Sequence, residues 1–201
     1  GAKSKIQVTY EGVEDHFLKT HRHVNENQKQ LIYVGSLYPH KNIEVVLQGL
    51  LKTPGYLLHV VGARNVFQEK IQARVKELQL NHRVKFHGYL EDQQLIALFH
   101  ECSALVQPSL FEGFGLTGIE AMASGLPVLA SDIPIFHEIY RDHAVFFDPH
   151  SAESFSIAVQ KLEDKTDNQL YHAKQYVEKT FSWKQMAEST VEMYHSVLQE
   201  S

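Results

Sequence analysis

The sequence predicts an α/β protein in which helices cover both faces of a Rossmann-like parallel sheet. Short apolar runs alternate with amphipathic helical patterns from residue 31 to residue 148, as in a series of strand–helix units. Strands joined by helical crossovers pair in parallel, and the helices then lie on the faces of the sheet. The 201 residues, 43% of them hydrophobic, are enough to bury the core of one such domain.

The predicted elements follow one another in a regular order. We expect strands at residues 31–36, 57–63, 84–89, 104–109, 127–131 and 144–148. We expect helices at residues 42–51, 67–80 and 91–102, and a further helix that begins within residues 111–120. The first helix places five apolar side chains on one face, which we expect to be buried: Ile43, Val46, Leu47, Leu50 and Leu51.

Both ends of the chain depart from this pattern. Residues 1–30 contain a short apolar strand at 6–10 and then a polar, poorly periodic stretch, which indicates a connection arriving from another unit. After Pro149 we expect helices at 151–163, 168–180 and 182–200 with no strand between them. We therefore expect a connection over residues 1–30, a ligand-binding domain over 31–180 and a final helix over 181–201.

Composition and charge exclude several classes of function. A net charge of −5 without any Lys/Arg run argues against nucleic acid as a partner and gives no patch for anionic lipid. No apolar run is long enough to span a bilayer, and the first residues lack the core of a signal peptide. The single cysteine, Cys102, suits a reducing compartment, so we expect a cytoplasmic protein. The histidines are scattered, and we expect no metal site.

The stretch "FEGFGLTGIEAM" follows a predicted strand and opens a helix. Gly113 and Gly115 allow the backbone to approach a ligand, and the free N–H groups of a helix N-terminus favour a phosphate. Glu112 at the turn and Glu120 in the helix can each accept hydrogen bonds from hydroxyl groups. Two such acids beside an anion-binding turn fit a ligand with a phosphate between two sugars, which describes a nucleotide sugar.

Each of these residues also has an ordinary structural explanation. Thr117 and Glu120 have the spacing of a capping box, in which Glu120 would only bond the backbone N–H of Thr117. Glu112 alone would be an ordinary solvated loop acid, and glycine-rich turns are weak signals by themselves. The functional interpretation depends on both acids and the glycines sharing one loop at the expected edge of the sheet.

The turn "VGSLYPHKN" after the first strand supplies a cation. Lys41 follows a tight turn at the start of a helix, from which its ammonium group can reach a diphosphate, although a surface lysine is the default for any single Lys. This turn contains only Gly35 and lacks the G-x-G-x-x-G spacing of dinucleotide-binding turns, so NAD is not expected as a cofactor.

Together these segments resemble the nucleotide-sugar-binding, C-terminal half of retaining glycosyltransferases with the GT-B fold, in the large group that includes many mannosyl- and glucosyltransferases. The family's pair of acids separated by seven residues matches Glu112 and Glu120 in "EGFGLTGIEAMASGLPVLAS". The segments "YVGSLYPHKN" and "VKFHGYL" resemble the family's phosphate turn and the strand that leads to its base pocket. The similarity runs from about Ile6 to Tyr194, and the double-acid motif is its most specific part.

The resemblance implies a role for each matched position. Glu112 would bind hydroxyl groups of the donor hexose, helped by backbone N–H groups of Phe114 and Gly115. Backbone groups of residues 116–117 would hold the diphosphate together with Lys41. The full implied donor site comprises Gly35, Ser36, Lys41, Gly88, Tyr89, Glu112, Gly113, Phe114, Gly115, Leu116, Thr117 and Glu120, with Glu112 and Lys41 as the catalytic residues.

The rest of the nucleotide has its own matched positions, and two positions depart from the family. Glu120 would bond the ribose diol, and the main chain near Gly88 and Tyr89 would contact the base. Many relatives have Arg where this chain has Ser36, which can donate a hydrogen bond but supplies no charge. His40 also stands where close relatives have Arg; a protonated His40 could partly replace that cation, or it is simply a solvent-facing turn residue.

The resemblance implies transfer of a hexose from a nucleoside diphosphate sugar to a glycan or lipid-linked acceptor with retained configuration and without a metal. The alternatives are a non-catalytic nucleotide-sugar-binding module and an epimerase or phosphorylase on the same fold. A GT-B enzyme also has an acceptor-binding half, which should precede this chain, would receive the final helix and would make any membrane contact. We therefore expect these residues alone to bind donor without useful transfer. The form of "VGSLYPHKN" slightly favours GDP-mannose over UDP-glucose as donor.

Overall fold

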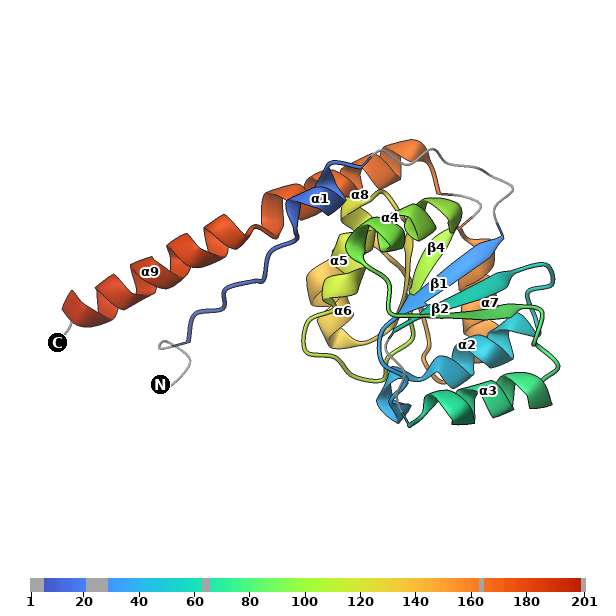
Figure 1. Ribbon diagram of the computed structural model, residues 1–201. Coiled ribbons are helices and arrows are strands. Elements are labelled where there is room, and N and C mark those ends of the chain that lie inside the picture. The colour runs from blue at the N-terminus through green and yellow to red at the C-terminus, as the bar shows by residue number, and fades with distance from the viewer. Residues whose placement is uncertain (1–5, 21–28, 63–65, 163–164, 200–201) are drawn as a thin grey trace.

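A computed structural model describes residues 6–20, 29–62, 66–162 and 165–199 (Figure 1). Its six strands form one parallel sheet in the order β3-β2-β1-β4-β5-β6, which confirms the predicted fold class. The strands are β1 Gln30–Val34, β2 Leu57–Val61, β3 Val84–Gly88, β4 Ala104–Gln107, β5 Val128–Ser131 and β6 Val145–Phe147. Every predicted strand from residue 31 onward is present, and no strand end differs from its predicted position by more than two residues.

Helices connect and cover the strands on both faces (Figure 1). The α-helices are α1 Asp15–Leu18, α2 Ile43–Leu50, α3 Gln68–Glu77, α4 Asp92–Glu101, α5 Leu116–Ala123, α6 Pro134–Tyr140, α7 Ala152–Gln160, α8 Asp167–Thr180 and α9 Trp183–Gln199. Two short 3-10 helices, η2 at Pro39–Lys41 and η3 at Arg141–His143, complete the described elements. The three helices predicted after Pro149 are α7, α8 and α9.

The sheet separates two apolar cores. One core packs α2, α3 and α7 against one face, with Leu47 and Phe155 fully buried. The other packs α1, α4, α5, α6 and α8 against the opposite face, with Phe99, Ile119 and Phe136 fully buried. The crossovers after β1 and β2 thus lie on one face and those after β3, β4 and β5 on the other, so the change of face falls between the adjacent strands β1 and β4.

Glycine at the end of β2 permits the strand ends to lie close together. Gly62 has a φ of +156°, and a Cβ atom there would lie 2.2 Å from the carbonyl oxygen of Gly35. The Gly35 N–H bonds the carbonyl of Val61, and the Gly62 N–H bonds the carbonyl of Gly88. The carboxyl ends of β1, β2 and β3 therefore form a continuous edge with no side chains between the backbones.

Three sequence-based expectations about local structure were wrong or incomplete. Residues 6–10 form no strand, because they run past the sheet without a partner strand, and Ile6 and Val8 remain 72% and 70% exposed. Leu51 is exposed rather than buried, since α2 ends at Leu50. Helices α1 and α6 were not predicted; both are too short to show a periodic pattern, and Pro134 at the start of α6 was the available signal.

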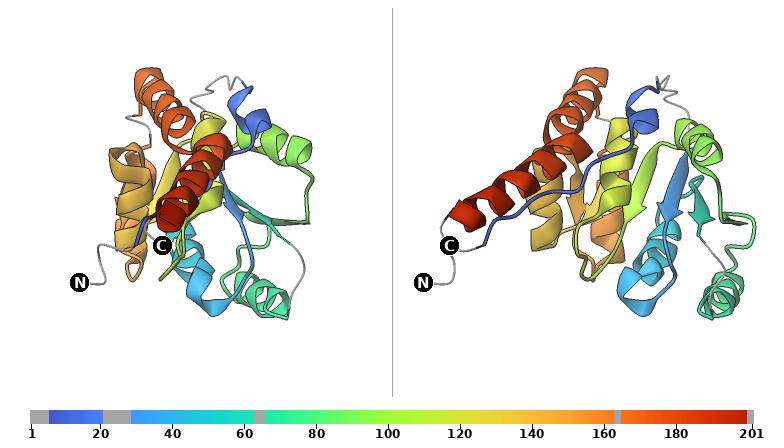
Figure 2. Two further views of the ribbon diagram at one scale, coloured as in Figure 1. Left: turned by 90° about the vertical axis from the view of Figure 1, so that its left-hand side faces the viewer. Right: turned by 60° about the vertical axis from the view of Figure 1, so that its left-hand side comes forward.

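The N-terminal segment nevertheless packs on the domain. Val13 and Phe17 are buried in the core beneath α4 and α5, and the Val13 N–H bonds the carbonyl of Phe181. Gly12 lies against the backbone of Trp183, so the segment runs beside the start of α9, and both project away from the sheet (Figure 2). Within the described residues, no helix has the length and apolar character needed to cross a membrane.

A pair of histidines, buried His59 and exposed His87, links β2 and β3. His59 Nδ1 lies 2.8 Å from His87 Nε2, and His59 Nε2 lies 2.7 Å from Gln30 Oε1. Because an amide oxygen only accepts, His59 donates from Nε2 and accepts at Nδ1 while both rings are neutral. Burial, His87 and the nearby Lys85 lower the pKa of His59 to about 4, and burial also lowers the pKa of His87.

The histidine pair predicts a loss of stability in mild acid. Unfolding returns His59 to an ordinary pKa near 6.5, so between about pH 6.5 and 4 the unfolded chain binds more protons and the native state is disfavoured. Between pH 7.5 and 4.5 the unfolding free energy should fall by about 1–3 kcal/mol less in His59→Phe than in the wild type. Urea unfolding over this pH range measures the difference. The exposed His82→Gln serves as control; equal pH profiles for wild type and His59→Phe would contradict the prediction.

Candidate functional site

The candidate site lies where the crossovers change face. Strands β1 and β4 are neighbours, but the chain leaves β1 toward α2 and leaves β4 toward α5, on opposite faces of the sheet. The loops over residues 35–42 and 108–115 therefore diverge at the carboxyl edge and leave a crevice between them, the position at which open α/β sheets bind ligands.

Asn42 fixes the first of these loops. It ends the short helix η2 with a left-handed φ of 53°, a conformation that Asn tolerates better than most residues. Its Nδ2 donates to the carbonyl oxygens of Pro108 at 3.0 Å and Pro149 at 2.8 Å. These bonds tie the turn after β1 to the loops after β4 and β6, and thereby place the preceding residue, Lys41.

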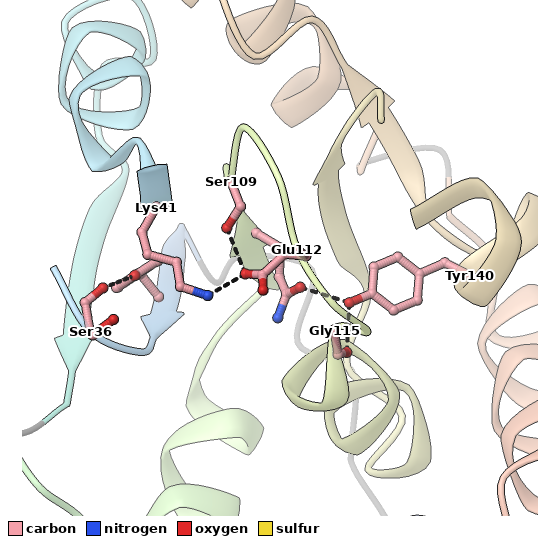
Figure 3. Close-up of polar contacts among 8 residues, drawn as sticks. Ser36, Lys41, Ser109, Glu112, Gly115 and Tyr140 are labelled. Carbon is pink, nitrogen blue, oxygen red and sulfur yellow. Dashed lines mark hydrogen bonds and ion pairs between the residues drawn. The ribbon is translucent and has the colours of Figure 1, made fainter. Parts of the chain in front are cut away.

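Lys41 and Glu112 meet across the crevice (Figure 3). The Lys41 ammonium group donates to Glu112 Oε1, and the Ser109 hydroxyl donates to the same oxygen at 2.8 Å. The side chains of Lys41 and Glu112 are only 21% and 17% exposed. Both are therefore largely withdrawn from water, where a charge requires a partner. The two residues predicted to be catalytic thus contact each other directly.

Tyr140 holds the start of α5 (Figure 3). Its hydroxyl oxygen lies 2.7 Å from both Gln107 Oε1 and the carbonyl oxygen of Gly115, and burial raises its pKa well above 10. Gly115 is the N-cap of α5 with a φ of +102°, and a Cβ atom there would lie 2.3 Å from that hydroxyl. A glycine is therefore required at this position for two independent reasons: other residues are strained at this φ, and the Tyr140 hydroxyl leaves no room for a Cβ atom.

Two adjoining cavities open beside these residues. The first, of about 210 Å³, is lined by Tyr33, Val34, Gly35, Lys41, Gln107, Ser109, Glu112, Gly115, Leu116 and Thr117. The second, of about 490 Å³, is lined by Val34, Gly35, Ser36, Tyr38, Val61, Gly62, Tyr89, Leu90, Asp92 and Leu95. Because Val34 and Gly35 line both, the cavities meet at the end of β1. The first cavity contains a cation, an acid and the N-terminus of α5, where N–H groups have no helical acceptor.

Glu120 lies outside the residues that line either cavity, one turn into α5. The capping box with Thr117, which was the alternative explanation of Glu120, does not form, because α5 begins at Leu116 and its N-cap is Gly115. In the described part of the chain the Glu120 carboxyl has no hydrogen bond or ion pair. Burial, with smaller contributions from Asp92 and Glu14, raises its pKa to about 7. A partly buried acid without a partner is unfavourable for the stability of the fold, and such groups occur often at functional sites.

The remaining predicted site residues occupy varied positions. Gly88 lines a third, much smaller cavity beside Gly35, and Gly113 is exposed with open space around it. The Phe114 ring packs against Tyr10, with centroids 6.0 Å apart, and so faces the N-terminal segment. The His40 ring is stacked on Phe111 and is not among the residues lining either cavity.

Sequence reasoning missed several residues that shape the site. Ser109 holds Glu112, Asn42 positions Lys41, and Tyr140 fixes the loop between them. Asn42 stands where an Asn directly precedes a helix, which was a usable signal, whereas the contact of Tyr140 with Gly115 spans 25 residues and required the fold. Among the residues that the structure describes, no three His, Cys, Asp or Glu side chains are grouped closely enough to hold a metal ion.

Fold and site together define an α/β protein in which a cation, an acid and a helix N-terminus share one crevice at the switch point of a doubly wound sheet. The family model described as "Glycosyl transferases group 1" matches residues 16–180, and the chain belongs to that family. This membership agrees with the resemblance expected from the double-acid motif.

The similar curated proteins include two O-antigen enzymes. The chain is 34% identical to O-antigen chain mannosyltransferase RfbU of Salmonella typhimurium over 165 residues, covering 81% of this chain and 46% of that protein. It is 29% identical to O-antigen chain mannosyltransferase B of Escherichia coli over 174 residues, covering 83% and 46% respectively. The chain thus spans about half the length of the curated relatives it matches.

Solved glycosyltransferase structures share the fold. A glycosyltransferase from Rickettsia africae superposes with a TM-score of 0.86 at 20% identity, covering 99% of this chain and 59% of that one. Sucrose-phosphate synthase from Thermosynechococcus elongatus gives a TM-score of 0.83 at 23% identity, covering 95% and 52%. Anabaena HepE in complex with UDP gives 0.79 at 21% identity, covering 94% and 57%. The chain therefore has the Rossmann-like architecture found in GT-B glycosyltransferases.

The pairing of Lys41 with Glu112 predicts a coupling larger than that of a surface ion pair. Removing one partner leaves the other charge largely buried and unpaired, so Lys41→Met should cost about 1–3 kcal/mol of unfolding free energy. The double variant Lys41→Met/Glu112→Gln should regain much of the lost unfolding free energy, as a double-mutant cycle would measure. The exposed pair Lys52–Glu153 (2.8 Å) is the control and should couple by less than about 1 kcal/mol; equal couplings would contradict the prediction.

The raised pKa of Glu120 predicts that its removal stabilises the free protein. Between about pH 4.5 and 7 the folded state retains a proton that the unfolded state has lost, so stability falls as the pH rises through this range. We expect Glu120→Gln to raise the unfolding free energy at pH 8 by about 1–3 kcal/mol and to have little effect at pH 4. The exposed Glu192→Gln is the control; destabilisation by Glu120→Gln at pH 8 would refute the assignment.

Proposed function

We propose that this chain is the donor-binding half of a retaining hexosyltransferase that takes its sugar from a nucleoside diphosphate sugar. The observation that supports this most strongly is the convergence of Lys41, Glu112 and the N-terminus of α5 on one cavity. A cation and a helix N-terminus suit a diphosphate, and a half-buried carboxylate suits sugar hydroxyls. The larger cavity, which adjoins at Gly35, has the apolar walls that a base needs.

In this proposal the diphosphate, the hexose and the ribose of the donor each have a protein partner. The diphosphate lies at Leu116 and Thr117 and draws Lys41 from Glu112, which then accepts hydrogen bonds from hexose hydroxyls. The ribose lies toward Glu120, whose carboxyl group then accepts hydrogen bonds from the ribose hydroxyl groups. Lys41 and the α5 N-terminus hold the charge of the leaving diphosphate, so the proposed donor site needs no metal or other cofactor.

The proposed reaction exchanges one bond at the anomeric carbon. The bond to the diphosphate oxygen breaks with its electron pair remaining on the diphosphate, and an acceptor hydroxyl oxygen forms the new glycosidic bond on the same face. The acceptor proton passes to the departing diphosphate oxygen, so the products are the glycoside and the nucleoside diphosphate. Retention of configuration follows from attack on the face that the diphosphate leaves.

Asp92 supports guanine as the base. Asp92 lines the larger cavity, and its carboxylate lies 3.1 Å from His16 Nε2. Guanine presents two adjacent donors, N1–H and the 2-amino group, which one carboxylate can accept together, whereas uracil presents a single N–H between two carbonyls. With the mannosyltransferase relatives, this favours GDP-mannose as the donor over UDP-glucose.

We further propose that the acceptor is held by a second half, since the chain spans about half of its relatives. Val191, Tyr194, Val197 and Leu198 leave an exposed apolar face on α9 that such a half would cover. Transfer requires an acceptor hydroxyl held against the anomeric carbon and exclusion of water, which one wall of a cleft does not provide. The chain alone should therefore bind donor and transfer little.

Calorimetry with GDP, UDP and ADP tests the donor site. We expect GDP to bind most tightly, and Lys41→Ala to weaken it about tenfold while the surface control Lys52→Ala does not. Glu120→Gln should also weaken it about tenfold, and Asp92→Asn should reduce the preference for GDP over UDP. Failure of all three nucleotides to bind at millimolar concentration would refute the proposal.

An assay of sugar transfer distinguishes an enzyme from a non-catalytic binding module. In a protein that joins this chain to its acceptor half, Glu112→Ala should lower transfer at least about a hundredfold and leave nucleoside diphosphate affinity nearly intact. Binding of GDP with no transfer from any hexose donor would instead identify a non-catalytic module.

A further inference from the structure

Four aromatic rings form a ladder along the rim of the candidate site. Phe111 stacks on His40 with centroids 4.7 Å apart, and His40 stacks on Tyr38 at 6.1 Å. Tyr38 meets the edge of Phe67 at 5.3 Å. This aromatic ladder (Phe111, His40, Tyr38 and Phe67) crosses from the loop after β4 to the turn after β1 and on to the start of α3.

The loops that bear the ladder are braced. The Leu110 N–H donates to the carbonyl oxygen of His40 at 2.8 Å, and the Asn42 side chain bonds the carbonyl of Pro108. The ring of Phe111 is therefore held on a cross-linked backbone with one face covered by His40. A ring held in this way loses little further conformational entropy when a ligand covers its other face.

Phe111 lies on the outer side of the loop whose inner side forms the donor site. Its side chain is 64% exposed and is not among the residues lining either cavity, whereas the side chain of its neighbour Glu112 is 17% exposed and lines the first cavity. The donor sugar of the proposed function occupies the inner side. A group that contacts Phe111 must instead approach from the open side of the crevice, which is the path left to the acceptor.

We propose that the free face of Phe111 is a stacking platform for a pyranose ring of the acceptor glycan, an inference that rests on the proposed function and adds an acceptor subsite to it. A pyranose has one face of C–H groups and a rim of hydroxyls. The C–H face covers an aromatic ring favourably, because it loses apolar contact with water and places weakly positive hydrogens over the negative ring face. The hydroxyl rim stays solvated or bonds to the other half.

Ligand-observed NMR tests the platform without turnover. The protein is saturated with GDP, its aromatic protons are irradiated, and magnetisation transfer to methyl α-D-mannopyranoside, methyl α-D-glucopyranoside and methyl α-D-galactopyranoside is measured. We expect transfer to the C–H protons of one sugar face for at least one of them, loss of most of it in Phe111→Ala, and its retention in Phe111→Trp. The exposed ring of Tyr171 on α8 supplies the control Tyr171→Ala, which should leave the signal unchanged.

Kinetics of the protein joined to its acceptor half provide the second measurement. Phe111→Ala should raise the acceptor KM about fivefold or more while the donor KM and GDP affinity change by less than about twofold. His40→Ala should show a smaller change of the same kind because it removes the support of Phe111, and His40→Phe, which restores a stacked ring, should restore the acceptor KM.

The possible results separate this inference from the proposed function. Sugar signals and acceptor KM that do not depend on Phe111 would overturn the platform and leave the donor site standing. A Phe111→Ala variant with weakened donor binding would also overturn it, because the ring would then belong to the donor site. Failure of the wild type to bind GDP, UDP or ADP would refute the donor site itself, and the platform with it.

Discussion

The ion pair of Lys41 with Glu112 is the interaction on which the site depends, and it exists because the sheet changes face between β1 and β4. Residues 71 positions apart meet because two neighbouring strands send their loops to opposite faces. The pair is largely buried in the free protein, with Ser109 as a further donor to the carboxylate. Two charges that neutralise each other across an open crevice are already desolvated, so an anionic ligand can replace one partner without the full cost of burying a new charge.

The order of strands and helices was predictable, because buried strands and amphipathic helices have different periods of apolar residues. The features that the sequence did not predict share one physical cause, which is that they depend on tertiary contacts. Residues 6–10 have a strand composition but no neighbouring strand. Thr117 and Glu120 have the spacing of a capping box, but the N-cap of α5 is Gly115, two residues before Thr117. Likewise Tyr140 determines the shape of the site from α6, a helix too short to be seen in the sequence. Each depends on tertiary contacts that no local pattern contains.

A second aromatic cluster joins the site loop to both ends of the chain. Phe114, in the loop between Glu112 and α5, packs against Tyr10 and Phe181, and Tyr10 and Phe181 also contact each other. Tyr10 Oη donates to Glu138 Oε1 at 3.0 Å, which anchors the N-terminal segment to α6. The segments that lead away from the domain therefore rest on the same loop that carries Glu112.

The loop over residues 108–115 thus carries side chains that point in three different directions. Glu112 points inward to Lys41, Phe114 points to the ends of the chain, and Phe111 points outward to solvent. Such divergence requires a backbone fixed independently of its side chains, and the fixed points are Pro108, bonded by Asn42, and Gly115, held by Tyr140. Because both anchors are hydrogen bonds to carbonyl oxygens, the side chains between them can change without loss of the loop's path. We infer that the side chain at position 111 can change while Glu112 keeps its contact with Lys41.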